Sequence, residues 1–222
     1  MQVVNIRTAR SIWLFDTGDL NPKGLNPLPF FMALKDRYHF LVWPKTPEDL
    51  SWTRSATTPK GVKFLDGSFS AGDQPLAVGL SVFNDGIIAD TSSSTDHSDS
   101  FLRDVIAFAA QHFGSTFDQA SINQKIYLSE MIVRADSTLA VASPKLSKLA
   151  ARMADISGLG ASAEFSGFEL RVHPRDAQQP FKFERDAAAF SAPNRYYSSA
   201  PMRTEDHKKL LMEFEAIMAG DA

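Results

Sequence analysis

The sequence predicts an α+β fold with a mainly antiparallel sheet and about four helices packed on it. Several short segments alternate apolar and polar residues as half-buried strands do, and they outnumber the segments with helical periodicity. The pair Asp85-Gly86 stands between two such segments and is typical of a two-residue hairpin with a type I′ turn, which joins antiparallel strands. Alternation with one polar face also favours this architecture over a doubly wound parallel sheet. We expect one α+β domain over residues 1–222, with a possible boundary between lobes near 115–143.

The strands are expected where alternating or continuous apolar runs are bounded by turn residues. Two short strands are predicted at 3–7 and 11–16, before a loop rich in Gly, Pro and Asn. The segment 168–172 should direct Phe168, Leu170 and Val172 inward, and the segment that starts at Phe181 should do the same with Phe181 and Phe183. Further strands are predicted at 40–43, 62–70, 76–83, 87–90 and 125–134. No internal repeat is evident.

Four helices are predicted from capping residues and apolar periodicity. Asn26-Pro27 and Ser143-Pro144 each place a good N-cap residue before a proline, which fits the first helical turn. Gly114, Gly158 and Gly220 stand where helices end. The helices are expected at about 26–37, 96–113, 144–157 and 204–219. Their apolar stripes include Phe101, Leu102, Val105, Ile106, Ala109 and Phe113 in the second helix, and Leu146, Leu149, Ala150 and Met153 in the third.

The composition excludes several classes of function. The chain has no cysteine, so disulfides, thiolate nucleophiles and Cys-ligated zinc are impossible. A net charge of -3 gives no basic field for broad nucleic-acid binding. Neither a signal peptide nor an apolar run near the roughly 20 residues of a membrane span is evident. We therefore expect a soluble cytoplasmic protein that needs no cofactor, and the 17 phenylalanines predict a large core or a buried partner surface.

The most polar segment, 90–104, reads D-T-S-S-S-T-D-H-S-D-S-F-L-R-D. Asp90, Asp96, His97 and Asp99 are weak candidates for catalytic acids and bases, with or without a divalent metal. The spacing differs from that of a calcium loop, and the segment has no glycine to let a phosphate approach the backbone. The alternative is a helix start, capped by Ser94, Thr95 or Asp96, with acids that favour the helix dipole. The sequence favours the helix start and assigns no metal site.

A second group of candidates is aromatic. Arg195, Tyr196 and Tyr197 stand between a strand and the last helix, and Arg and Tyr are typical anchors of protein interfaces. The alternative is an edge strand whose rings pack on that helix. Trp52 lies in an irregular loop at 44–60 and is a further candidate for partner binding, because an aromatic residue in a polar loop usually docks somewhere.

Two functions remain open. The first is a non-catalytic binding or assembly subunit, in an intracellular protein complex or a homo-oligomer. The motifs of common enzyme classes are missing, and G-L-G-A-S-A at 158–163 follows a helix, where a dinucleotide fingerprint would follow a strand. The alternative is a metal- or carboxylate-dependent hydrolase that uses the 90–104 loop. The sequence favours a protein partner or self-association, and leaves open whether the chain is an enzyme.

Overall fold

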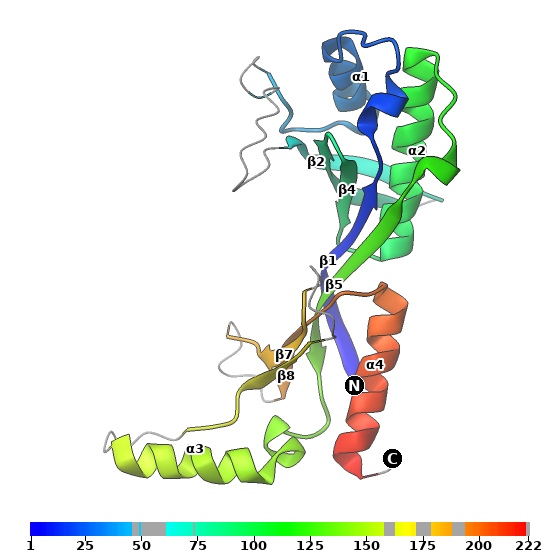
Figure 1. Ribbon diagram of the computed structural model, residues 1–222. Coiled ribbons are helices and arrows are strands. Elements are labelled where there is room, and N and C mark those ends of the chain that lie inside the picture. Colours follow the sequence, from blue (N-terminus) through cyan, green and yellow to red (C-terminus); the bar gives the residue numbers. More distant parts are fainter. Residues whose placement is uncertain are drawn as a thin grey trace. The chain divides into compact units, whose positions relative to one another are not determined.

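The computed structural model describes residues 1–45, 49, 61–72, 74–157, 163–171, 179–187 and 194–220. This part of the chain forms an antiparallel sheet of eight strands with four α-helices (Figure 1), which confirms the predicted fold class. The strands are β1 (Gln2–Leu14), β2 (Val62–Ala71), β3 (Gln74–Phe83), β4 (Gly86–Thr91), β5 (Gln124–Arg134), β6 (Gly167–Leu170), β7 (Phe181–Arg185) and β8 (Arg195–Ala200). The helices are α1 (Leu28–Tyr38), α2 (Thr95–Phe113), α3 (Pro144–Ser157) and α4 (Thr204–Ala219).

The order of elements repeats once along the chain, which the sequence analysis missed. A strand, a helix, three strands and a second helix run from β1 to α2, and the same order runs from β5 to α4. The sheet order β2-β3-β4-β1-β5-β8-β7-β6 puts corresponding strands in corresponding places on either side of the β1–β5 pair. The chain divides into two compact units, Thr8–Leu128 and Met1–Arg7 with Ser129–Ala222, so β1 and β5 each contribute residues to both. The expectation of a single domain stays a prediction.

The N-terminal unit has an aromatic core. All six residues of the predicted α2 stripe are buried in it, together with Trp13 of β1. The rings of Phe30 and Phe113 lie 5.0 Å apart between α1 and α2, and those of Phe31 and Phe64 lie 5.6 Å apart between α1 and β2. Such tilted and edge-on contacts are the favoured geometry of aromatic pairs. Phenylalanine therefore fills the layer between the helices and the sheet, as its abundance predicts.

The C-terminal unit has a smaller core under α4. Phe183 and Tyr196 stack with ring centroids 4.7 Å apart, and Phe214 of α4 meets Phe183 edge-on at 5.2 Å. Phe181 and Phe183 are buried as predicted. Leu170 is 60% exposed, so the predicted inward direction is wrong for this residue, and Val172 lies outside the described residues. The four-residue β6 is one of the two edge strands of the sheet, so its side chains have a neighbouring strand on one side only.

Three of the predicted strands differ in the structure. The segments 3–7 and 11–14 belong to one strand, β1, which continues through Arg10, whereas residues 15 and 16 lie beyond its end. Arg10 lies directly opposite Asp90 in β4, and its Nε is 2.6 Å from Oδ1 of the carboxylate. This ion pair between neighbouring strands stabilises β1 at a charged residue, so the strand continues there. The segment 40–43 is not a strand, because only Val42 forms a bridge, to Leu65.

The hairpin at Asp85-Gly86 is confirmed, but its turn type is not. Phe83 pairs with Gly86, so the two loop residues are Asn84 and Asp85. Neither of them has a positive φ, which a type I′ turn requires at both positions. Gly86 is needed for another reason: a Cβ at this position would lie 2.3 Å from the carbonyl oxygen of Trp13. The glycine lets β1 approach β4 closely.

Candidate functional site

The polar segment at 90–104 folds as the start of α2. Ser94 is the N-cap residue, with an extended backbone and a hydroxyl that accepts a hydrogen bond from the His97 N–H over 3.2 Å. Asp96 lies in the first turn and is exposed to solvent, where a negative charge favours the helix dipole. The structure therefore bears out the prediction that this segment begins and caps a helix.

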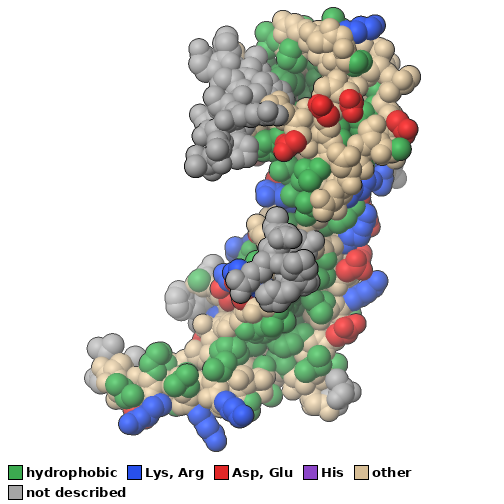
Figure 2. Space-filling model, in the orientation of Figure 1, with side chains coloured by type: hydrophobic (Ala, Val, Ile, Leu, Met, Phe, Trp, Pro, Cys, Tyr) green, Lys and Arg blue, Asp and Glu red, His purple; other side chains and the backbone are tan. Residues whose placement is uncertain are grey.

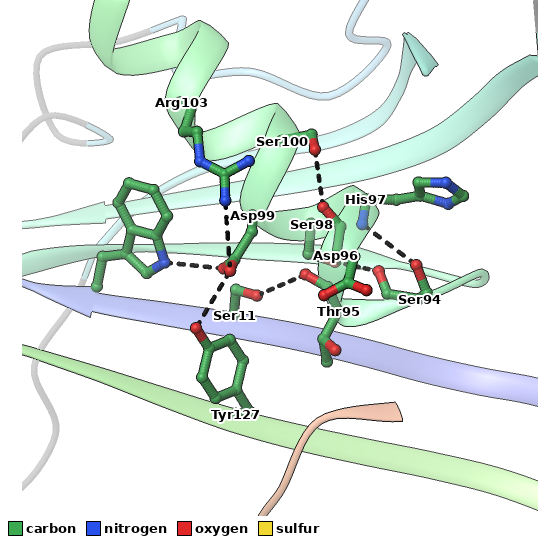
Figure 3. A network of polar contacts seen from close by, with 11 residues as sticks. Ser11, Ser94, Thr95, Asp96, His97, Ser98, Asp99, Ser100, Arg103 and Tyr127 are labelled. Atoms are coloured by element: carbon green, nitrogen blue, oxygen red, sulfur yellow. Dashed lines mark hydrogen bonds and ion pairs between the residues drawn. The ribbon is translucent and has the colours of Figure 1, made fainter. Parts of the chain in front are cut away.

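Asp99 is not on the surface of this helix but in the core. It is 1% exposed, and its Oδ1 accepts a hydrogen bond from Nε1 of Trp13 over 2.9 Å. Its Oδ2 accepts a hydrogen bond from the hydroxyl of Tyr127 over 3.1 Å and lies 4.0 Å from the Arg103 guanidinium. The carboxylate thus joins α2 to β1 and to β5 (Figure 3). A buried carboxylate requires such partners, so Asp99 is first of all a structural residue.

Buried hydroxyls attach the same helix start to the sheet. Ser98 Oγ donates a hydrogen bond to the Ala9 carbonyl over 2.7 Å and lies 3.1 Å from Thr91 Oγ1. Ser11 Oγ donates to the Thr95 carbonyl over 3.2 Å. Each of these buried hydroxyls thus has a hydrogen-bond acceptor on a neighbouring element. The Ser and Thr residues of the segment therefore fix α2 on β1 and β4.

The remaining candidates of this segment do not form a metal centre. Asp90 forms the ion pair with Arg10, and the His97 Nδ1 lies 2.9 Å from Ser93 Oγ. Within the described ranges, no group of three or more His, Cys, Asp or Glu residues could hold a metal ion. Since Asp99 points into the core, the structure does not direct Asp90, Asp96, His97 and Asp99 at one common point.

The second group of candidates lies on β8, an interior strand between β5 and β7, so the expectation of an edge strand is wrong. Tyr196 is 2% exposed, and its hydroxyl accepts a hydrogen bond from the Leu139 N–H over 2.9 Å. Arg195 and Tyr197 are partly exposed; Arg195 Nε lies 3.0 Å from Asp186 Oδ2. Tyr196 thus belongs to the core, while partner binding by Arg195 and Tyr197 stays a prediction. Trp52 lies outside the described residues.

A pocket of about 520 Å³ adjoins Tyr197 in the C-terminal unit. The Tyr197 hydroxyl donates a hydrogen bond to Glu130 Oε1 over 2.9 Å, and burial together with this carboxylate raises the pKa of Tyr197 to about 12. The other charged groups of the pocket pair with near neighbours: Arg7 lies 3.8 Å from Asp186, and Glu184 lies 2.9 Å from Lys182. The pocket is lined by Arg7, Glu130, Glu184, Arg185, Asp186, Ala187 and Tyr197. The lining therefore holds three carboxylates and two guanidinium groups, and Lys182 and Arg195 outside it pair with Glu184 and Asp186.

A serine and a histidine also meet in this unit. Ser198 Oγ and His207 Nε2 lie 2.8 Å apart, which resembles the spacing of a nucleophile and its base. Both residues are 0% exposed, and Ser198 also donates to the Lys182 carbonyl over 3.1 Å. Burial lowers the pKa of His207 to about 4. A substrate cannot reach this pair, which is part of the packing between α4 and β8.

Most of the apolar stripe that the sequence predicts for α3 is exposed and not packed in a core. Four large apolar residues of this helix are exposed: Leu146 by 42%, Leu149 by 63%, Met153 by 60% and Ile156 by 72%. We call these four residues the α3 stripe. Its helix buries Ala150, and Ser147 Oγ donates to the Ala140 carbonyl over 3.1 Å in the short 3-10 helix Leu139–Ala142. Figure 2 shows hydrophobic side chains along α3 with Lys and Arg side chains beside them.

Comparison with known proteins gives no family. No family model matches the chain, and no curated protein matches it. Among solved structures, the chain is similar to "Methanococcus jannaschii TBP", with a TM-score of 0.41 and 12% identity over 99% of this chain and 98% of that chain. At this TM-score the likeness supports no conclusion about fold or function. None of the helices in the described part of the chain is long and apolar enough to cross a membrane.

Proposed function

We propose that the chain is a non-catalytic binding or assembly subunit of a cytoplasmic protein complex or homo-oligomer. The α3 stripe is the observation that carries this proposal. Four large aliphatic side chains in a row on one helix are a contiguous apolar surface, and surfaces of that kind mark protein interaction sites. Scattered single apolar residues would need no such explanation.

The contacts at the start of α2 agree with this proposal. A hydrolase at 90–104 would need carboxylates that reach a substrate, whereas Asp99 accepts hydrogen bonds from Trp13 and Tyr127 in the core. Asp90 is held in the ion pair with Arg10. A hydrolase that uses Asp96 and His97 is the alternative, and its support is weaker because their described contacts are those of a helix N-terminus.

Native mass spectrometry of the gently purified chain tests the proposal. We expect an oligomer or a complex with another protein, with an interface above roughly 1,000 Å². A monomer that retains no partner would contradict the proposal. A monomer that carries a bound metal ion or small molecule would instead support the hydrolase, and Asp96 and His97 would be the first residues to substitute.

A further inference from the structure

We propose that the α3 stripe binds an amphipathic helix of another protein whose apolar side chains are flanked by Asp and Glu. This inference rests on the proposed function, because it names the chemistry of the partner that the binding subunit would recognise.

The α3 stripe has the spacing of a helix-binding face. Leu146, Leu149, Met153 and Ile156 follow one another at intervals of three, four and three residues, so they form one continuous row on an α-helix. Apolar anchors with this spacing are how amphipathic helices pack against one another and into grooves. The stripe extends over most of α3, so a partner helix could lie along it.

A basic row runs beside the stripe. Lys145, Lys148 and Arg152 each precede a position of the stripe by one residue, so they are rotated by about 100° around the helix. All three are exposed. One acid, Asp155, ends the row. Positive charge on the accessible flank of an apolar row is complementary to acidic residues on a partner.

The basic row argues against an antiparallel pair formed with a second copy of α3. In a two-fold antiparallel helix pair, the same flank of each helix faces the other. The row of Lys145, Lys148 and Arg152 would then face the same row of the other copy. Like charges on adjacent helices repel one another and destabilise the pair. An acidic helix on the same face forms opposite-charge pairs instead.

The composition of α3 favours a protein over a lipid surface. Helices that lie in a membrane interface commonly carry Trp, Phe or Leu on the apolar face and a polar face that is rich in Lys and Arg. The α3 sequence P-K-L-S-K-L-A-A-R-M-A-D-I-S has no aromatic residue, and its acid stands in line with the three cations. The three cations and one acid of α3 therefore fit a protein partner better than an anionic lipid surface.

The first helix of the N-terminal half shows what the corresponding element looks like when it is covered. In α1, Phe30, Phe31, Leu34 and Tyr38 are buried. In α3, which has the same place in the repeated order of elements, the buried residue is Ala150. The large apolar residues of α3 therefore lie on the outside of the unit, where they can meet another protein.

Two synthetic helical peptides test the charge of the partner. In both peptides leucine residues follow one another at intervals of three and four, so they form one apolar face of a helix. The positions beside this face carry glutamate in the acidic peptide and lysine in the basic peptide. Binding to the full chain is measured by fluorescence anisotropy at low and high salt. We expect the acidic peptide to bind about tenfold or more tightly than the basic one at low salt, with the preference falling as salt screens the charges.

Three variants make the test specific. Leu149→Ser with Ile156→Ser should abolish binding of both peptides, whereas Lys148→Glu with Arg152→Glu should reverse the preference. Ile217→Ser is the matched control, because Ile217 is 62% exposed on α4, and it should bind as the unchanged chain does. Circular dichroism of each variant establishes that the fold is retained.

The opposite outcomes are distinct. Equal affinity for both peptides, no binding of either, or binding that survives the Leu149→Ser and Ile156→Ser changes would overturn the inference. Binding to phosphatidylserine vesicles but not to the acidic peptide would overturn it in favour of a lipid surface. If native mass spectrometry still shows a complex that these changes leave intact, the proposed function stands and only the assignment of α3 fails.

Discussion

The indole Nε1 of Trp13 donates a hydrogen bond to Oδ1 of Asp99 over 2.9 Å, and both side chains are buried. The two residues are 86 positions apart, in β1 and α2. Tyr127 in β5 donates to the other carboxylate oxygen, and the Lys125 ammonium lies 3.9 Å from the centre of the Trp13 ring. This network explains why Asp99 is buried, although the sequence alone suggests a surface or catalytic residue.

Replacing Asp99 should lower stability strongly. Asp99→Ala removes the acceptor of the buried Trp13 N–H and of the partly exposed Tyr127 hydroxyl, and the free energy of unfolding should fall by about 3 kcal/mol. Asp99→Asn keeps the shape and should cost less. The exposed neighbour Asp96→Asn is the control and should cost no more than about 1 kcal/mol, because it removes a solvent-exposed charge near the helix N-terminus. Urea denaturation measures all three; equal losses for Asp96 and Asp99 would contradict the network.

Removing the cap of α2 should have a smaller effect. Ser94→Ala removes the acceptor for the His97 N–H, and N-cap substitutions of this kind cost about 1 kcal/mol of unfolding free energy. Ser92 is exposed in the same segment, so Ser92→Ala serves as the control and should leave the urea midpoint nearly unchanged. If both variants unfold at the same midpoint, Ser94 is not the cap.

His207 should make the C-terminal unit sensitive to acid. Burial lowers the pKa of His207 in the folded chain to about 4, below its ordinary value of 6.5. The unfolded chain therefore binds a proton at a higher pH than the folded chain does. The stability that His207 contributes is complete above about pH 6.5 and is lost as the pH falls toward 4.

The variant His207→Gln isolates this effect. Denaturation from pH 7 to pH 4 should show a steeper loss of stability in the unchanged chain than in the variant, with a difference of up to about 3 kcal/mol. His97, which is partly exposed at the start of α2, provides the matched control as His97→Gln and should keep the steep dependence. Parallel pH profiles for the chain and the His207 variant would show that His207 does not titrate differently on folding.

The local elements could be predicted from the sequence, because their signals are local. Ser94, the α2 stripe and Gly114 define a helix through residues that are neighbours in the chain. The sequence did not predict that β1 is continuous. The ion pair that stabilises the strand at Arg10 is formed with Asp90, which is 80 residues away in the chain. The Asp99 network was missed for the same reason.

The repeated order of elements leaves few traces in the residues. The helices α1 and α3 both begin near a proline after Asn26 or Ser143, and α2 and α4 both begin with a buried threonine followed by an acid. These are common helix signals, so they do not reveal a repeat by themselves. The exposure of the α3 stripe was also hidden, because an apolar row has the same periodicity whether or not anything covers it.

The most direct test of the central claim is native mass spectrometry of three proteins purified in parallel: the unchanged chain, the Leu149→Ser and Ile156→Ser double variant, and the control Ile217→Ser. Because these side chains are exposed, each substitution should alter the stability of the chain itself by no more than about 0.5 kcal/mol. The account predicts a complex for the unchanged chain and the control, and a monomer for the double variant. A monomer in all three samples would contradict it.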